Sequence, residues 1–402
     1  MKKLFVALLL LLGGRVQSQT PDSLAPAPPA AKKWFETFAI RGYVQARYNR
    51  LLETNPDLGC EQCDRSWGKN GGISLRRVRL IFFGQLHERV YFYIQPDFAS
   101  SLSGSTSLQV GQLRDAYFDL GLDKASQFRI RLGQSKIPFG FENMQSSQNR
   151  LALDRNDAIN SAFSNERDLG AFFYWAPTAV RQRFAKLVRE GLKGSGDYGM
   201  LGLGVFNGQT ANRAELNNQQ HVVARFTYPL VVGRHIIEPG LQAYSGDYVL
   251  TSDQLSAGVK TRPDRSYLDQ RVAATFVLYP QPFGVQAEFN TGRGPEFNPR
   301  TDSIESRSLH GGYVLLNYRL RYKQQQFYPF LRAQYYEGGK KHERDARSHG
   351  VREAELGVEW QPLSSFELVA MYTLSSRRYE DFQKPDNRQR GGLLRLQAQI
   401  NF

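Results

Sequence analysis

The last ten residues of the chain read Leu393-Leu394-Arg395-Leu396-Gln397-Ala398-Gln399-Ile400-Asn401-Phe402. Apolar and polar residues alternate with a period of two from Leu394 to Phe402, which predicts a β-strand with one apolar and one polar face. In a soluble sandwich the polar face would meet water, whereas in a membrane barrel the apolar face meets lipid and the polar face lines a lumen. An aromatic residue at the last lipid-facing position favours a barrel that closes by pairing its last strand with its first.

The other end of the chain indicates export. Residues 1–18 have the three parts of a secretory signal peptide: a basic start at Lys2 and Lys3, an apolar core from Leu4 to Leu12, and the small-x-small site Val16-Gln17-Ser18. The apolar core is too short to span a bilayer as a helix, which needs about 20 residues. Residues 19–37 are rich in Pro and Ala and predict a flexible periplasmic lead, so the expected barrel covers residues 38–402.

Composition narrows the class further. No apolar run of 18 or more residues occurs in the chain, which excludes helical membrane spans. The formal net charge is +14, and removal of Lys2, Lys3 and Arg15 with the signal peptide leaves +11. A basic exported protein can bind nucleic acid, acidic glycans or anionic lipid, or conduct anions. The choice depends on where the positive side chains point.

The two cysteines, Cys60 and Cys63, form a single C-x-x-C motif in an expected loop. Without a second cysteine pair or a following histidine, the motif is weak evidence for metal or haem. In an oxidising compartment a small disulfide within the loop is the favoured interpretation, with reduced thiols as the alternative. We therefore expect no cofactor and no metal site.

Alternating segments recur along the chain and number sixteen, an even number of strands of about the length that crosses a bilayer. The expected strands are 40–49, 74–86, 90–98, 113–122, 127–134, 170–176, 198–206, 222–228, 236–248, 267–279, 283–290, 312–321, 327–336, 352–360, 366–374 and 393–402.

Connections between these segments alternate between short turns and long polar loops, as in outer-membrane barrels. The short turns are 87–89, 123–126, 231–234, 281–282, 322–326 and 363–365, and the long loops are 51–72, 99–111, 135–168, 208–220, 251–266, 293–308, 340–350 and 380–391. Residues 177–197 break the rule, because they are long on the turn side; extended strand and a small periplasmic helix both fit them. A soluble sandwich of this size would need several domains with linkers, and no linker follows Lys33.

The polar faces of the expected strands carry charges of both signs. Arginine and lysine candidates for anion binding in the lumen are Arg41, Arg47, Arg77, Arg79, Arg129, Arg131, Lys136, Arg319, Arg332 and Arg395. Carboxylates such as Asp97, Asp115, Glu288 and Glu355 form a counter-set. Segregated arginines favour anions, whereas arginines that pair with these carboxylates would leave a non-selective channel.

The segment from Gln134 to Asp168 is the third long loop. It carries Lys136, Arg150, Arg155 and Arg167 and the sequence Pro138-Phe139-Gly140-Phe141. A loop of this length with bulky and charged residues is a candidate to fold inward and constrict the lumen; an outward lid is the alternative.

The stretch Arg129-Ile-Arg-Leu-Gly-Gln-Ser-Lys-Ile-Pro-Phe-Gly-Phe-Glu142, preceded by Leu113-Arg-Asp-Ala-Tyr-Phe118, resembles the phosphate-selective porin O and P family. In that family a Gly-Gln-x-Lys-x-Pro-Phe-Gly strand leads into the constricting third loop. The resemblance implies homotrimers and passage of anions such as phosphate along an arginine ladder with lysines at the constriction. This chain departs from the pattern, since Lys136 is the only lysine of the segment, and Asp154 and Asp157 dilute its charge.

Other function classes find less support. No G-x-S-x-G or H-E-x-x-H motif occurs and the six histidines are scattered, so we expect no catalytic residues and no enzyme. No nucleic-acid-binding motif accompanies the basic residues. The sequence therefore predicts an outer-membrane porin for small hydrophilic solutes, surrounded by outer-membrane lipid. A non-conducting structural or adhesin barrel is the first alternative, and a barrel hydrolase is the second.

Overall fold

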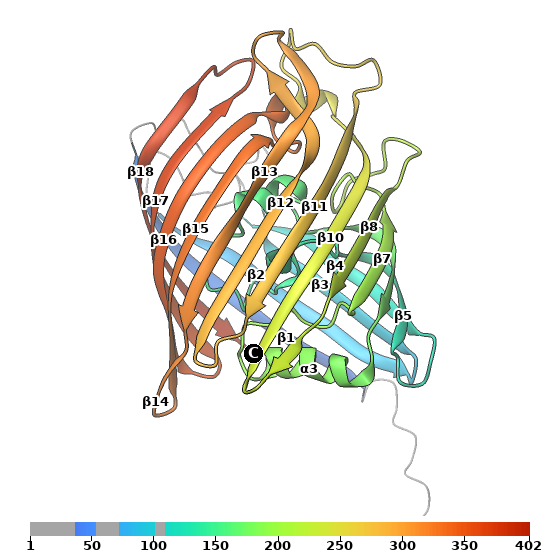
Figure 1. Cartoon of the computed structure of the whole chain (residues 1–402), viewed down its shortest axis with the longest axis vertical. Helices are drawn as coiled ribbons and strands as arrows, with labels where there is room; N and C mark the ends of the chain where they lie inside the picture. Colours follow the sequence, from blue (N-terminus) through green and yellow to red (C-terminus); the bar gives the residue numbers. More distant parts are fainter. Residues whose placement is uncertain (1–36, 54–71, 101–108) are drawn as a thin grey trace, which may run out of the picture.

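The computed structural model describes residues 37–53, 72–100 and 109–402, and they form one closed antiparallel β-barrel (Figure 1). The strands are β1 (Phe38–Glu53), β2 (Gly72–His87), β3 (Val90–Ser100), β4 (Val110–Gly121), β5 (Phe128–Lys136), β6 (Arg167–Trp175), β7 (Leu201–Phe206), β8 (His221–Thr227), β9 (Leu230–Val232), β10 (His235–Val249), β11 (Ser266–Leu278), β12 (Phe283–Asn298), β13 (Ser303–Tyr318), β14 (Leu320–Tyr322), β15 (Gln325–Gly339), β16 (Ser348–Leu363), β17 (Phe366–Glu380) and β18 (Asn387–Asn401). The helices are α1 (Phe141–Met144), α2 (Asp157–Ala162) and α3 (Thr178–Arg189), with short 3-10 helices η2 (Ser252–Gln254) and η3 (Arg344–Ala346).

These strand segments make sixteen crossings of the barrel wall. β8 and β9 both pair with β10, and β13 and β14 both pair with β15, so each of these two couples is one interrupted strand. Every one of the sixteen segments expected from the alternation overlaps one crossing. The predicted strand count is therefore confirmed.

The barrel closes through its first and last strands, as predicted. β1 and β18 pair antiparallel from Tyr43 opposite Asn401 to Glu53 opposite Gly391. Backbone bonds between Gly42 and Phe402 extend the seam: the Gly42 N–H donates to the Phe402 carbonyl at 2.7 Å, and the Phe402 N–H donates to the Gly42 carbonyl at 3.0 Å. Closure leaves no unpaired strand edge, which a hydrocarbon environment would penalise.

Side-chain polarity is inverted relative to a soluble sheet. On β18, Leu396 is 45% and Ile400 is 53% exposed, whereas Arg395 and Gln399 are 2% and 1% exposed. The same reversal recurs around the wall, where exposed leucines include Leu241 and Leu356. The apolar faces therefore point outward toward lipid and the polar faces point into the lumen.

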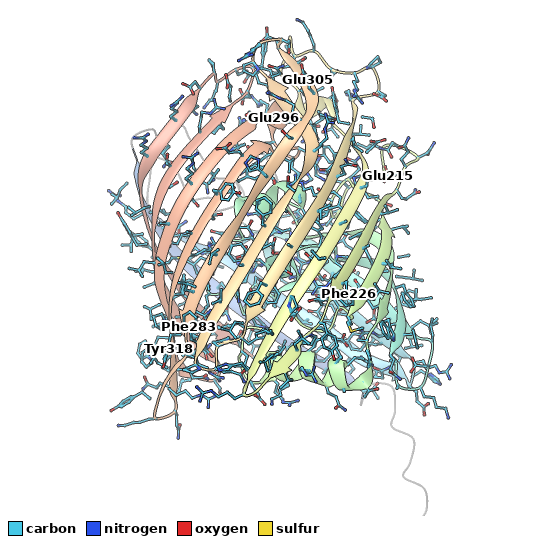
Figure 2. All side chains as sticks on the ribbon, in the orientation of Figure 1. Glu215, Phe226, Phe283, Glu296, Glu305 and Tyr318 are labelled. Atoms are coloured by element: carbon cyan, nitrogen blue, oxygen red, sulfur yellow. The ribbon has the colours of Figure 1, made fainter. Side chains whose placement is uncertain are left out.

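The two ends of the barrel differ. The short turns, α3 and the C-terminus lie at one end, called the turn end here, and the long loops lie at the other, called the loop end (Figure 1). Toward the turn end the outer surface carries the exposed aromatics Phe226, Phe283 and Tyr318, while Glu296 and Glu305 lie toward the loop end (Figure 2). Aromatic girdles are typical of the borders of the hydrocarbon layer.

Three expectations about connections differ from the structure or are completed by it. The expected long loop 380–391 is too long, because β17 and β18 stay paired up to Tyr379 opposite Asn387 and the connection is residues 381–386. The expected long loop 293–308 is wrong, because β12 and β13 stay paired up to Asn298 opposite Ser303 and enclose only a short turn. The strict alternation of apolar and polar residues stops after Asn290, but the pairing of the two strands continues beyond it. Residues 177–197, left open above, contain the helix α3. In the described part of the chain, no helix is long and apolar enough to cross a membrane.

Candidate functional site

Residues 137–166 connect β5 to β6 and are called the third loop here. Nearly all of them are buried, including every residue of α1 and α2. Asn156 begins α2 as its N-cap, with its side-chain oxygen accepting a bond from the Ile159 N–H at 3.1 Å. Gly140 adopts φ +75°, and a Cβ there would lie 2.8 Å from a carboxylate oxygen of Glu288. The Pro-Phe-Gly motif therefore lets the backbone approach the inward face of β12.

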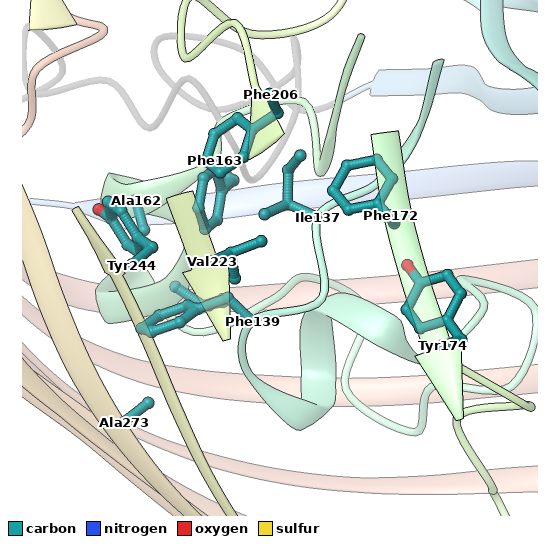
Figure 3. Close-up of a cluster of buried hydrophobic side chains, with 11 residues drawn as sticks. Ile137, Phe139, Ala162, Phe163, Phe172, Tyr174, Phe206, Val223, Tyr244 and Ala273 are labelled. Carbon is teal, nitrogen blue, oxygen red and sulfur yellow. The ribbon is translucent and has the colours of Figure 1, made fainter. Parts of the chain in front are cut away.

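Apolar side chains hold the third loop against β6, β7, β8, β10 and β11. Phe139 and Phe163 of the loop each lie 4.9 Å from the ring of Tyr244, measured between ring centroids. Ile137, Ile159 and Ala162 of the loop also belong to this cluster, which includes Phe172 of β6 (Figure 3). Edge-on aromatic contacts of this kind add to the hydrophobic gain from burial, so the cluster fixes one side of the loop.

Ion pairs hold the opposite side of the third loop. Glu142 accepts a bond from Arg332 of β15 at 2.8 Å. Asp154 lies 3.2 Å from Arg47 of β1 and also bonds Arg395 of β18. A further pair, at 2.8 Å, joins Asp157 to Arg377 of β17. Since these pairs are buried, loss of one partner would leave an uncompensated charge. The inward faces of β6 to β18, together with Arg47, are called the packed side.

Lys136, at the end of β5, bonds the third loop itself. Its ammonium group donates to the carbonyl oxygens of Asn143 at 2.8 Å and Gln145 at 2.7 Å, with a longer contact to Met144 at 3.4 Å. A lysine has three N–H donors, and these carbonyls lie at the C-terminal end of α1. Lys136 is buried and is a positioning residue for the loop.

Glu166, the last residue of the third loop, collects several cations. Its carboxylate lies 2.6 Å from Arg150 and 3.3 Å from Arg155, bonds Arg167, and is 3.8 Å from Lys136. Burial alone would raise the pKa of Glu166, but the surrounding cations outweigh it and hold the pKa well below its ordinary value. The carboxylate is therefore ionised at neutral pH and joins the two ends of the loop.

A cavity of about 380 Å³, called the loop-end cavity, lies between the third loop and the inward faces of β2 to β4, and the connections 207–220 and 340–347 complete its lining. Eight arginine or lysine residues and four aspartate or glutamate residues line it, a net charge of +4. Among the described residues, Arg77 bonds no carboxylate; it donates to the side-chain oxygen of Gln45 at 2.7 Å. Arg114 likewise donates only to a backbone carbonyl, that of Asn165, at 3.4 Å.

Two arginines of the loop-end cavity, Arg76 and Arg114, turn toward the lumen because each lies at a break in the strand pairing. The β1–β2 register shifts between Gln45 and Ala46, which leaves Arg76 as an extra residue beside Arg77. The β3–β4 register shifts after Gln95, which leaves Arg114 as an extra residue beside Asp115. A bulge of this kind re-aims a side chain. Strict alternation puts both arginines on the outer face, and no signal in the alternation reveals the bulges.

A second cavity, the turn-end cavity, has a volume of about 640 Å³ and lies against the inward faces of β2 to β5. Eight basic and three acidic residues line it, a net charge of +5. Arg79 lines both cavities and bonds Asp97 at 2.7 Å. Four half-buried tyrosines also line the turn-end cavity. The inward faces of β2 to β5, where both cavities lie, are called the open side.

Helix α3 separates the two sides at the turn end. Its residues Val180, Phe184 and Leu187 are buried against an apolar cluster that includes Phe141 of the third loop and Tyr279. Residues of its other face, among them Arg181, line the turn-end cavity. The segment after the helix reaches across the barrel, where Lys193 bonds Glu359 of β16 at 2.5 Å.

The structure divides the residues expected to bind anions into two groups. Six of them line the cavities of the open side: Arg41, Arg77, Arg79, Arg129, Arg131 and Lys136. Arg47, Arg332 and Arg395 lie outside both cavities and are bonded to carboxylates, Arg47 and Arg395 to Asp154 of the third loop and Arg332 to Glu355 of β16. Arg319 lies at the turn end, where it donates to the carbonyl of Glu190. Cys60 and Cys63 fall outside the described residues, so the expected disulfide stays a prediction.

Comparisons with known proteins agree on family and fold. A family model described as phosphate-selective porin O and P matches residues 55–402. Comparison with curated proteins finds no match. Among solved structures, the outer membrane channel DcaP of Acinetobacter baumannii is similar, with 15% identity and a TM-score of 0.56 over 91% of this chain and 97% of that chain.

Two further structures are similar over 91% of this chain and 99% of theirs. One is an anion-selective porin from Comamonas acidovorans, at 10% identity and a TM-score of 0.53. The other is OmpT of Vibrio cholerae in its trimer form, at 9% identity and a TM-score of 0.50. At these identities the likeness shows the barrel fold alone.

Proposed function

The chain belongs to the phosphate-selective porin O and P family and is an outer-membrane porin; from that premise we propose that it passes small hydrophilic solutes with a preference for anions, phosphate among them. Members of this family and barrels of this fold are channels, in agreement with the expectation that the protein is not an enzyme. The preference for anions depends on the charges that line the lumen.

The observation that carries the proposal is the charge of the two cavities on the open side. Their linings have net charges of +4 and +5, and they meet at Arg79. We infer that they are the two halves of one permeation path. A path lined by excess arginine favours anions, because the electrostatic potential is positive along the whole length of the path. The non-selective alternative requires the arginines to be paired with carboxylates. Arg77 does not meet this requirement in the described residues, because it donates to the side-chain oxygen of Gln45.

The third loop sets the width of this path in our proposal. Its contacts with the packed side leave the passage along β2 to β5, and Lys136 keeps the loop in place. The cations grouped around Glu166 then stand at the narrowest part, between the two cavities. Anion preference would arise there from arginines, not from a free lysine.

The test is the reversal potential of single channels across a KCl gradient, measured for the wild type and for Arg77→Gln. A unit charge about 6 Å from a passing ion in water-like surroundings contributes about 0.7 kcal/mol, favourable for chloride and unfavourable for potassium, and therefore about ten-fold in their permeability ratio. We expect the chloride-over-potassium preference to fall by about that factor. Arg77→Gln suits the test because it removes a charge without leaving a carboxylate unpaired.

Arg352→Gln is the matched control, since Arg352 is exposed on the barrel exterior and the same charge is lost there. Its reversal potential should equal that of the wild type. Phosphate is then titrated into the wild-type and control channels. Block of the current at low phosphate concentration supports a phosphate preference, and a current without such block indicates a general anion channel. Equal permeability of chloride and potassium in the wild type would refute the anion preference.

Assembly and export complete the proposal. OmpT, one of the similar barrels, is described in a trimer form, and we propose a homotrimer embedded in outer-membrane lipid. We also propose that residues 1–18 are removed as a signal peptide. Chemical cross-linking of the purified protein should give a three-chain band, and mass spectrometry of the mature chain should place its first residue at Gln19. Cross-linking that stops at one or two chains would contradict the trimer.

A further inference from the structure

The turn-end cavity contains a feature that charge selection alone does not need. Tyr91, Tyr93, Tyr117 and Tyr198 all line it and are half-buried, so part of each ring remains accessible to the cavity. Among the described residues, no tyrosine, phenylalanine or tryptophan lines the loop-end cavity. The described linings of the two halves of the path therefore differ: the loop-end cavity offers charged and polar groups to a solute, and the turn-end cavity adds tyrosine rings.

Most of these rings form a column on the wall. Tyr93 stacks on Tyr117 with ring centroids 5.2 Å apart. The guanidinium of Arg131 lies 3.8 Å from the Tyr117 ring and 5.4 Å from the Tyr198 ring, and it also bonds Asp119 at 2.7 Å. Tyr91 stands apart from the column, because in the described part of the chain no ring or cation covers it. Its ring is open to a solute.

Cations without a carboxylate partner accompany the rings. Within the described ranges, neither Arg41 nor Arg89 has a carboxylate at salt-bridge distance, and both line the turn-end cavity. Arg41 lies 5.1 Å from the ring of Phe83, which covers one face of its guanidinium. Arginine is suited to planar anions, because its fork of N–H donors matches the two oxygens of a carboxylate.

From these contacts we propose that the turn-end cavity is a binding subsite for aromatic carboxylates, with the ring against Tyr91 and the carboxylate at Arg41. The inference rests on the proposed anion channel and adds a solute class to it. The cavity volume of about 640 Å³ lies within the range of small-molecule sites. The net charge of +5 favours an anion over a neutral sugar, which could also stack on a tyrosine.

The test compares two acids of equal charge and similar size, benzoate and cyclohexanecarboxylate, as blockers of chloride current in planar bilayers. Aromatic pairing is worth about 0.5–1.5 kcal/mol beyond area burial, which corresponds to about 2- to 13-fold. We expect benzoate to reach half-block at a concentration lower than that of cyclohexanecarboxylate by a factor in this range. Equal half-block concentrations would overturn the proposal while leaving the anion channel intact.

Variants assign the two interactions to their residues. Tyr91→Leu should abolish the difference between the acids, and Tyr91→Phe, which keeps the ring, should preserve it. Arg41→Gln should weaken block by both acids alike and leave their ratio unchanged. If Tyr91→Leu keeps the full preference for benzoate, the ring does not bind at Tyr91 and the assignment is wrong. A wild-type protein that carries no chloride current would overturn the proposed function and the subsite together.

Discussion

The two sides of the lumen hold the same residue types and use them differently. On the packed side, Arg332 is fully buried between Glu142 of the third loop and Glu355 of β16. On the open side, Arg77 faces a cavity and bonds no carboxylate in the described chain. Both arginines lie on inward faces of the barrel wall, Arg332 on β15 and Arg77 on β2. What separates them is the third loop, whose carboxylates neutralise the arginines that it reaches.

The difference shows how the third loop of a porin could set the proposed ion selectivity without a change in the strands of the barrel wall. A barrel that is lined all round by arginine would repel itself, and buried charges are costly unless paired. Here the third loop covers the inward faces of β6 to β18 with an apolar cluster and with carboxylates. Both cavities that line β2 to β5 carry an excess of positive charge.

The largest effect is expected from a substitution of an arginine whose ion pairs lie on the packed side. Arg332→Met leaves the buried carboxylate of Glu142 without its ion-pair partner and that of Glu355 with Arg395 alone, and breaking a buried pair costs about 3–5 kcal/mol. We expect a lower unfolding temperature in detergent and noisier single-channel current, because the third loop loses its anchor. Heat-dependent gel migration and bilayer recordings measure the two effects.

Arg352→Met is the control for this variant. Arg352 and its partner Glu337 are 79% and 50% exposed, and exposed pairs contribute about 0–1 kcal/mol. The control should unfold with the wild type. If Arg332→Met also does so, the packed side is not held by its ion pairs and the comparison fails.

A smaller effect is expected at Lys136, where the two sides meet. Lys136→Met keeps the length of the side chain and removes the bonds to the carbonyls of Asn143 and Gln145; unsatisfied buried acceptors cost about 1–3 kcal/mol. The third loop should therefore loosen, which broadens the current amplitudes. The chloride preference should change less than in Arg77→Gln, because the Lys136 ammonium faces carbonyls.

Lys124→Met is a matched control, because Lys124 is exposed on the short turn after β4. It removes the same charge and should leave current amplitudes unchanged. A Lys136→Met channel that loses most of its anion preference with quiet, uniform currents would show that Lys136 acts on the solute directly, as the family resemblance implies.

How much of this could be predicted from the sequence depends on what each residue contacts. The sixteen strands follow from alternation, since lipid demands an apolar face along every crossing, as at Leu396 and Ile400. The helix α3 left a signal in the spacing of Val180, Phe184 and Leu187, which repeats at helical intervals. That pattern is enough to choose a helix over extended strand for residues 177–197.

The division of the lumen could not be predicted in the same way. Whether an inward arginine meets water or a carboxylate depends on contacts between residues far apart in sequence, such as Arg332 with Glu142. Bulges at Arg76 and Arg114 also defeat the alternation, because one extra residue turns toward the lumen. The sequence pattern therefore predicts the strands of the barrel wall, but only the folded structure shows which inward side chains face a cavity.

The smallest effect expected is that of pH, and its sign follows from the loop carboxylates. Burial would raise the pKa of Asp154, but Arg47 and Arg395 outweigh it and hold the pKa below the ordinary value of about 4. Burial would likewise raise the pKa of Asp157, which Arg377 and Lys340 hold low in the same way. A group whose pKa is lowered on folding contributes stability above its ordinary value and loses it as the pH falls through the lowered one. The loop contacts should therefore be unchanged between pH 7 and pH 5 and weaken only below about pH 3.

Single-channel current noise at pH 7, 5 and 3 measures this, with Asp154→Asn at pH 7 as the reference for one loop carboxylate without its charge. The wild type should stay quiet at pH 5 and at pH 3, because the lowered pKa keeps Asp154 ionised there, and should approach the noise of the variant only as the pH falls further. Noise that already rises between pH 5 and pH 3 would mean that the carboxylates of the third loop titrate near their ordinary values. The arginines of the packed side would then not neutralise them, and the distinction between the two sides would be lost.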